Sequence, residues 1–222
     1  MLVIRHIIFD LDGTLVDSCG DCVTILSDML RERGSMHMID HDAARPWMSK
    51  GGVEMVSALM GGESLNPEAD LMEFRERYKQ FTTPKASVFN GVAEGLERLG
   101  ATSARLAICS NKPAVLCERV LEDVDLASHF DAIVGWKDGM RKKPHPDLLD
   151  ETLQLLDADP KDCVFIGDSR LDKELAVQAN MRFYFVSYGY AEKEWSPGNS
   201  ISFDSFSQLT DALVMELQAQ YV

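Results

Sequence analysis

Five short runs of apolar, β-prone residues punctuate the chain, and each is bounded by residues typical of turns. Within the runs at residues 2–9 and 162–167, the stretches HIIF and CVFIG are almost continuously apolar, which is typical of strands buried on both faces of a sheet. Three further runs lie at residues 104–110, 131–135 and 182–187. We therefore predict five strands, at least two of them deep inside the protein.

Segments with the 3.6-residue spacing of amphipathic helices follow the later strands. Alternation of strand and helix produces right-handed crossovers and a mostly parallel sheet with helices on both faces. The pattern therefore predicts the α/β class, with a Rossmann-like doubly wound parallel sheet as its core. The helical segments of this core lie at residues 112–124, 145–157, 172–181 and 206–220.

One long stretch between the first two predicted strands interrupts this alternation. It contains several helical patterns and no strand pattern, and residues 82–87, with Pro84, have the composition of a return linker. We therefore predict a catalytic core of residues 1–15 and 86–222, and an all-helical cap domain inserted at residues 16–85. The helical patterns of the cap lie at residues 22–34, 52–62 and 67–81.

The overall composition narrows the possible partners of the chain. Its 222 residues are 45% hydrophobic and 26% charged, as in an ordinary globular protein. The 36 acidic and 22 basic side chains leave a formal net charge of −14. Such a charge opposes binding to nucleic acid or to an anionic membrane, although a small anionic substrate can still be held by a few local cations.

Segment lengths and cysteine content bear on the compartment. No run approaches the roughly 20 apolar residues that span a bilayer, and the first apolar run, interrupted by Arg5 and His6, is a poor signal peptide. Five cysteines, an odd number, fit a reducing compartment, so we predict a cytoplasmic protein.

Cys19 and Cys22 have the C-x-x-C spacing of a redox pair or half a zinc site, but no second pair completes such a zinc site. We interpret them as small residues of a helix. No heptad pattern separates monomer from homodimer.

Polar residues stand where the predicted strands end. Asp10 follows the first strand, Ser110 ends the second, and Asp168 follows the fourth, while Lys143 stands in the loop after the third. In open α/β sheets, ligands bind outside the carboxyl ends of the strands. These side chains are therefore expected to converge on one edge of the sheet.

The residue types at this edge suit phosphoryl chemistry. Asp10 and Asp168 can share a hard divalent cation such as Mg²⁺, which relieves the repulsion between them. Ser110 can donate a hydrogen bond, and Lys143 can offer a charge, to phosphate oxygens. Asp10 can then attack an electrophile while Asp12, two residues later, moves a proton.

Four segments together resemble the four motifs of the haloacid dehalogenase-like phosphatases. They are DLDGTLVDS, CSNKP with Ser110, KKPHPD with Lys143, and GDSRLD with Asp168 and Asp172, and they occur in the family's order. The segments CSNKP, ARPWMSKGGVEMV and VFNGVAEGLERL resemble the phosphoglycolate phosphatase branch more closely. Asn180 departs from that branch, which usually has glycine there, but asparagine tolerates the left-handed conformation.

The resemblance implies a mechanism and a metal. Asp10 would form an aspartyl-phosphate, and Asp12 would protonate the leaving alcohol and later activate water. Mg²⁺ would be held by Asp10, the main-chain carbonyl of Asp12, and Asp168. Ser110 and Lys143 would hold the phosphoryl group.

Other residues are predicted to support this site or to select the substrate. Asn111 joins the phosphate-binding set, and Thr14 and Asp172 have supporting roles, Asp172 by orienting Lys143 or the waters of the metal. From the predicted cap, Arg45 and Lys50 are expected to reach the leaving group of the substrate.

These observations predict a Mg²⁺-dependent phosphomonoesterase that acts on a small phosphorylated metabolite, with 2-phosphoglycolate as the first choice. A sugar phosphomutase of the same superfamily is one alternative, and phosphate release without isomerisation separates the two. The other alternative is a catalytically silent regulatory protein that binds phosphate and metal.

Overall fold

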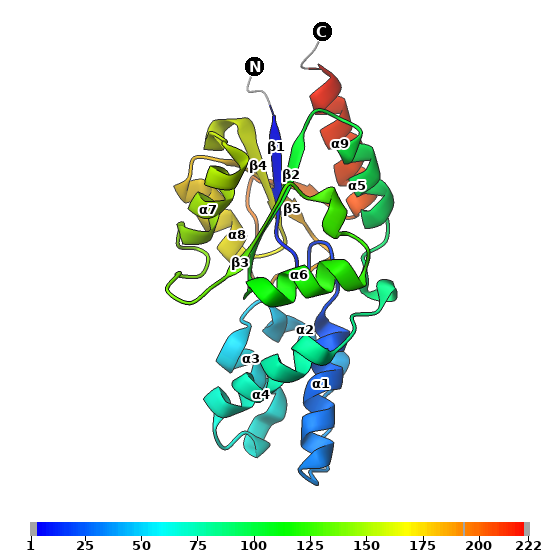
Figure 1. Ribbon diagram of the computed structural model, residues 1–222, viewed down its shortest axis with the longest axis vertical. Coiled ribbons are helices and arrows are strands. Elements are labelled where there is room, and N and C mark those ends of the chain that lie inside the picture. The colour runs from blue at the N-terminus through cyan, green and yellow to red at the C-terminus, as the bar shows by residue number, and fades with distance from the viewer. Residues whose placement is uncertain (1–3, 193, 220–222) are drawn as a thin grey trace.

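A computed structural model describes residues 4–192 and 194–219. Its centre is one sheet of parallel strands in the order β3-β2-β1-β4-β5-β6 (Figure 1), which confirms the predicted doubly wound α/β core. The strands are β1 (His6–Phe9), β2 (Arg105–Pro113), β3 (Ala132–Trp136), β4 (Cys163–Gly167), β5 (Arg182–Val186) and β6 (Ile201–Phe203).

Helices cover both faces of the sheet (Figure 1), with α7 and α8 on one face and α5 and α9 on the other. Short 3₁₀ turns occupy residues 61–63, 85–87, 127–129 and 160–162. The helices are α1 (Cys19–Glu32), α2 (His41–Met48), α3 (Gly52–Met60), α4 (Pro67–Gln80), α5 (Val92–Gly100), α6 (Ala114–Asp123), α7 (Asp147–Leu156), α8 (Arg170–Gln178) and α9 (Phe206–Ala219).

The central strand β1 shows why the sheet is two-sided. All four of its residues are buried, and successive side chains of a strand point to opposite faces. Ile7 and Phe9 pack in the cluster that includes α5 and α9, whereas Ile8 packs in the cluster of α7 and α8. The apolar run of the sequence therefore fills two hydrophobic cores at once.

The helices α1 to α4 form an insertion between β1 and β2, and they lie beyond the carboxyl ends of the strands (Figure 1). The chain leaves and re-enters the core through two adjacent segments. The backbone N–H of Asp17 donates to Ser87 O at 2.7 Å, and that of Phe89 donates to Leu15 O at 3.0 Å. The insertion is thus attached to the core through two hydrogen-bonded segments, and the first of them follows Asp10 and Asp12 closely in the chain.

Several details differ from the sequence-based expectations. The helices α2 and α5 and the edge strand β6 were not predicted, and β6 has only three residues, too few for a visible alternation. The strand β2 continues to Pro113 through an irregular register after Ser110, so α6 begins two residues later than expected. Residues 2, 3 and 220 of the predicted first strand and last helix lie outside the described residues.

Two expectations about local structure are confirmed. Asn180, in place of the usual glycine, has a φ of 52°, within the left-handed region that asparagine tolerates. Cys19 and Cys22 lie one turn apart in α1, both buried and neither in a disulfide. Among the described residues, no helix is long and apolar enough to cross a membrane.

Candidate active site

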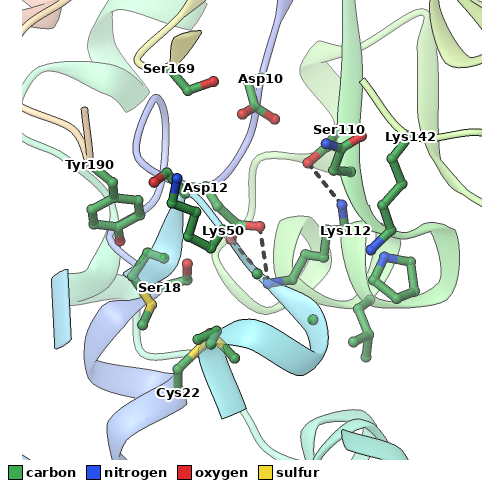
Figure 2. Close-up of a pocket in the computed structure, with 18 of the residues that line it drawn as sticks. Asp10, Asp12, Ser18, Cys22, Lys50, Ser110, Lys112, Lys142, Ser169 and Tyr190 are labelled. Atoms are coloured by element: carbon green, nitrogen blue, oxygen red, sulfur yellow. Dashed lines mark hydrogen bonds and ion pairs between the residues drawn. The ribbon is translucent and has the colours of Figure 1, made fainter. Parts of the chain in front are cut away.

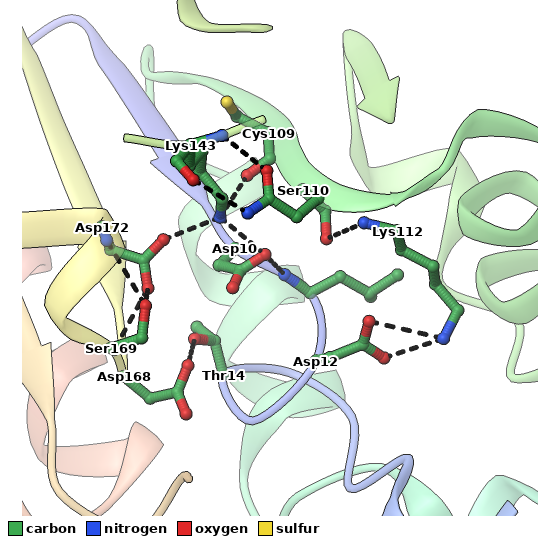
Figure 3. Close-up of polar contacts among 12 residues, drawn as sticks. Asp10, Asp12, Thr14, Cys109, Ser110, Lys112, Lys143, Asp168, Ser169 and Asp172 are labelled. Carbon is green, nitrogen blue, oxygen red and sulfur yellow. Dashed lines mark hydrogen bonds and ion pairs between the residues drawn. The ribbon is translucent and has the colours of Figure 1, made fainter. Parts of the chain in front are cut away.

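The centre of the site is a buried lysine between two carboxylates (Figure 3). Lys143 Nζ lies 3.0 Å from an oxygen of Asp10 and 2.7 Å from one of Asp172, and it also donates to Cys109 O at 3.0 Å. Burial alone would lower the pKa of Lys143, but the two carboxylates raise it above its ordinary value. The lysine is therefore charged, and it lies beside the expected nucleophile as predicted.

Asp10 is held at the end of β1 in a strained electrostatic environment. Its backbone N–H donates to Ile166 O of the neighbouring strand, and its side chain accepts from the N–H of Leu11 at 2.7 Å. Burial raises the pKa of Asp10 to about 6, and the nearby Asp172 and Asp12 add to the effect, although Lys143 opposes it. A further positive charge at this position would favour the ionised form.

Asp168 shows most clearly where such a charge would fit. It is only 2% exposed, and within the described part of the chain no lysine or arginine lies within 4.0 Å of it. Its oxygens accept from the N–H of Tyr190 at 2.6 Å and from the hydroxyl of Thr14 at 3.3 Å. Burial, followed by the charges of Asp172 and Asp10, raises its pKa well above the ordinary value.

The backbone around Asp168 leaves no room for side chains. A Cβ atom added at Gly13 or at Gly189 would overlap the Asp168 carboxylate. Gly13 also has a φ of 82°, which glycine adopts without strain. Carboxylate oxygens of Asp10, Asp168 and Asp172 lie within 4.8 Å of one another, so this edge of the sheet gathers hard oxygen donors of the kind that Mg²⁺ prefers.

Asp172 is already occupied by protein donors. One of its oxygens accepts from Lys143, and the other accepts from the N–H of Ser169 at 3.1 Å in the capping box that begins α8. The contact with Lys143 is the one expected of a supporting residue. Asp172 therefore holds the lysine in position, and Asp10 and Asp168 are left to face the cavity.

The second acid has a lysine of its own, which sequence analysis missed. Lys112 Nζ lies 3.0 and 3.3 Å from the two oxygens of Asp12 (Figure 3). It also lies 4.4 Å from the ring centre of Tyr78, which belongs to α4. The Lys112 side chain is 8% exposed. Burial would lower its pKa, but the charge of Asp12 raises it well above the ordinary value. Its place in the CSNKP segment, between the predicted phosphate ligands and a proline, was the available signal.

The predicted phosphate ligands lie on the same side of the site. Ser110 is 2% exposed, and its hydroxyl accepts from the N–H of Lys112 at 3.3 Å. The side chain of Asn111 pairs with the backbone of Lys143 in both directions, accepting at 2.7 Å and donating at 3.3 Å. Asn111 thus connects β2 to the lysine loop.

The two predicted cap residues occupy different positions. Arg45 donates to Asp17 at 2.7 Å and lies 5.1 Å from the ring centre of Tyr190, and it is not among the described residues that line the cavity. Lys50 lines the cavity and forms an ion pair with Glu192 of the core. Arg45 is therefore placed to hold the insertion to the core, whereas Lys50 has access to a bound ligand.

One cavity of about 140 Å³ lies between the sheet edge and the insertion (Figure 2). Its charged lining residues include Asp10, Asp12, Asp168, Lys50, Lys112 and Lys143. Figure 2 shows Asp10 and Ser110 on the core side, with Lys112 and Lys142 reaching in opposite Tyr190. The insertion contributes mainly apolar walls. These are Met48, Met55, Leu71, Phe74 and Tyr78.

Comparisons with known proteins agree with this geometry. The family model described as haloacid dehalogenase-like hydrolase matches residues 7–186. The chain is 32% identical to a phosphoglycolate phosphatase of Colwellia psychrerythraea over 93% of this chain and 96% of that one. It is 31% identical to the N-acetylmuramic acid 6-phosphate phosphatase of Pseudomonas putida over 88% of each chain.

A solved structure shows the same fold. The haloacid dehalogenase-like family hydrolase from Streptococcus pneumoniae superimposes with a TM-score of 0.77 over 96% of this chain and all of its own, at 21% identity. The parallel sheet, the acids at its edge and the matches over nearly the whole length lead to one conclusion: the chain belongs to the haloacid dehalogenase-like hydrolase family, in its phosphoglycolate phosphatase-like branch, and is a phosphatase.

Proposed function

We propose that the chain hydrolyses phosphate monoesters of small metabolites through an aspartyl-phosphate on Asp10. One observation carries the proposal: two carboxylates line one cavity, and each is held by a different lysine. Asp10, which forms an ion pair with Lys143, lies deep at the sheet edge, whereas Asp12, which forms an ion pair with Lys112, lies nearer the insertion. Two acids in different surroundings can perform different tasks.

In the first step, an oxygen of Asp10 forms a bond to phosphorus as the bond between phosphorus and the ester oxygen breaks. Asp12 gives its proton to the departing alcohol oxygen. In the second step, Asp12 removes a proton from water, whose oxygen bonds to phosphorus and releases Asp10 and inorganic phosphate. We expect Lys143, Ser110 and Asn111 to hold the phosphoryl oxygens through both steps, since all three line the cavity.

The donor set fits Mg²⁺, because Asp168 is a buried carboxylate without a cationic side chain beside it in the part of the chain that the structure describes. Asp10, Asp168 and the main-chain carbonyl of Asp12 would hold the ion. When bound, Mg²⁺ would neutralise the acids and polarise a phosphoryl oxygen. Thr14 and Tyr190 keep Asp168 oriented.

We propose residues 16–85 as the cap, since their four helices cover the carboxyl edge of the sheet. A cap that excludes water while the ester reacts would favour transfer to Asp10 over side reactions. As substrates, 2-phosphoglycolate and N-acetylmuramic acid 6-phosphate are the first two candidates, because relatives over 30% identical are named for them. A catalytically silent regulatory role is inconsistent with a chain that is a phosphatase.

The test measures inorganic phosphate released from both esters, with Mg²⁺ and with EDTA, by wild type and by Asp10→Asn. We expect release that needs Mg²⁺ and falls by about four orders of magnitude or more in the variant. Asp42→Asn is the matched control, because the Asp42 side chain is 96% exposed. Full activity in Asp10→Asn would contradict the mechanism. Isomerised phosphate ester in place of free phosphate would instead identify a mutase.

A further inference from the structure

Carboxylates neutralise almost all the cations of this acidic protein. Among the arginines and lysines that the structure describes, only four have no carboxylate oxygen within 4.0 Å. With 36 acidic residues against 22 basic ones, a cation without a partner is the exception. The four are Arg75, Lys142, Lys161 and Lys173.

Two of these four line the same cavity. Arg75 comes from α4 of the insertion, and Lys142 comes from the core loop after β3. Both stand over the ring of Trp136, with the Arg75 Cζ 5.4 Å and the Lys142 Nζ 5.3 Å from its centre. The Trp136 indole N–H donates to Met140 O at 2.8 Å, which fixes the ring. The other two unpaired lysines do not line this cavity.

The two charges are left without compensation in a half-buried position. Burial lowers the pKa of Lys142, and the neighbouring Arg75 lowers it further. A cation–π contact with Trp136 attracts each of them but removes no charge. Two like charges held together at a cavity wall form a favourable site for an anion.

The neighbour in sequence has the opposite surroundings. Lys143 is enclosed by Asp10 and Asp172, whereas Lys142 lines the cavity at a distance from both of them (Figure 2). A Cβ atom added at Gly52, the first residue of α3, would lie 3.8 Å from Lys142 Nζ. An anion at Lys142 would therefore touch both the core and the insertion.

We propose that Arg75 and Lys142 bind a second anionic group of the substrate, a carboxylate or second phosphate on its alcohol part, and so determine which phosphate esters are accepted. The proposal rests on the proposed function, because it assumes an ester phosphate beside Asp10. Arg75 can hold a carboxylate or phosphate through two parallel N–H donors, and Lys142 adds a point charge. Apolar residues such as Met55 and Phe74 line the cavity and can contact the carbon skeleton.

The test compares kcat/KM for matched esters with and without the second anion. The carboxylate pair is 2-phosphoglycolate and 2-hydroxyethyl phosphate, and the phosphate pair is glycerol 1,3-bisphosphate and glycerol 3-phosphate. In Arg75→Gln and in Lys142→Gln, we expect kcat/KM for the preferred ester with the second anionic group to fall about 10- to 100-fold, the range for lost hydrogen bonds to charged groups. For the partner ester without the second anionic group, kcat/KM should change by less than about threefold, because the ester phosphate keeps its own ligands.

Lys161→Gln is the matched control, because it removes an equally unpaired charge from a residue outside the cavity. Its selectivity should equal that of wild type, and thermal unfolding checks that every variant folds. Equal losses on both members of each pair, or no loss on either, would overturn the proposal.

Failure of the proposed function looks different, since wild type would then release phosphate neither from the four esters nor from N-acetylmuramic acid 6-phosphate. In that case calorimetry on Asp10→Asn still decides the inference. The double variant Asp10→Asn, Arg75→Gln should bind 2-phosphoglycolate more weakly than Asp10→Asn does, but should bind 2-hydroxyethyl phosphate equally well; this result would support the anion site. Unchanged affinities would overturn it.

Discussion

The two walls of the cavity differ in whether their cationic side chains are paired with carboxylates. On the sheet edge, Lys143 and Lys112 are each paired with carboxylates, and only Asp168 has no charged partner among the described residues. On the wall nearest the insertion, Arg75 and Lys142 have none, and most of the other side chains are apolar. The first wall is arranged around fixed charges, whereas the second leaves positive charge available.

This difference separates reaction from selection. Groups that react must be held in one geometry, which the network around Asp10 achieves through buried ion pairs and backbone donors. Groups that choose between substrates must remain unsatisfied until the right ligand arrives, because only then does binding discriminate. The adjacent residues Lys142 and Lys143 show both conditions side by side.

The strongest test of this contrast replaces each of these lysines by methionine. Lys143→Met leaves Asp10 and Asp172 buried without their cation, so the free energy of unfolding should fall by about 3–5 kcal/mol. Lys142→Met removes a cation that repels Arg75, so stability should change by no more than about 0.5 kcal/mol. Urea unfolding of both variants measures the difference, and similar losses in the two would contradict the contrast.

A second test concerns the lysine that holds Asp12. Lys112→Met should lower kcat about 100-fold, the size of a typical general acid–base contribution, because Asp12 loses the donor that positions it. KM should change far less, since Asp10 and its ligands remain. The exposed helical pair of Lys79 and Glu76 provides the control Lys79→Met, with kcat unchanged. An unaltered kcat in Lys112→Met would remove Lys112 from the reaction.

A third test uses the pH dependence of stability to measure how far the folded protein raises the pKa of Asp10. Its pKa of about 6 in the folded protein lies above the ordinary 3.8, so the folded state binds more protons between about pH 4 and 6. Stability of the wild type therefore falls as pH rises through this window, and Asp10→Asn escapes that loss. In EDTA, the stability of the variant relative to wild type should rise by about 2 kcal/mol from pH 4 to pH 7.

Asp42→Asn, an exposed replacement of the same kind, should show no such trend. Saturating Mg²⁺ at pH 7 should raise the stability of wild type more than that of Asp10→Asn, because a ligand stabilises the state that binds it. If the difference in the free energy of unfolding between Asp10→Asn and wild type did not depend on pH, the pKa of Asp10 would not be raised in the folded protein.

The smallest expected effect concerns Lys50. Its ion pair with Glu192 is exposed, so Lys50→Ala should change the free energy of unfolding by less than about 0.5 kcal/mol. If Lys50 reaches the substrate, KM should rise or kcat should fall for the natural ester, while p-nitrophenyl phosphate hydrolysis is spared. Equal changes on both esters would exclude Lys50 from substrate selection.

The sheet edge was accessible to sequence analysis for a simple reason. Parallel strands all end at one edge, so any polar residues after buried strands must meet there. Asp10, Asp168 and Lys143 lie together in the structure as that rule predicts, and Asp172 contacts Lys143. Of the two adjacent lysines, the predicted Lys143 is the one that contacts Asp10.

What the sequence determined by itself was the parallel sheet, the helical insertion and the acids at the strand ends, because strand and helix periods and chain direction are local properties. Tertiary packing alone places Arg45 over the ring of Tyr190, Lys112 between Asp12 and Tyr78, and Arg75 and Lys142 over one tryptophan ring. Each of these contacts joins the insertion to the core. These contacts depend on how the insertion packs against the core, and such packing leaves no periodic pattern of residues in the sequence.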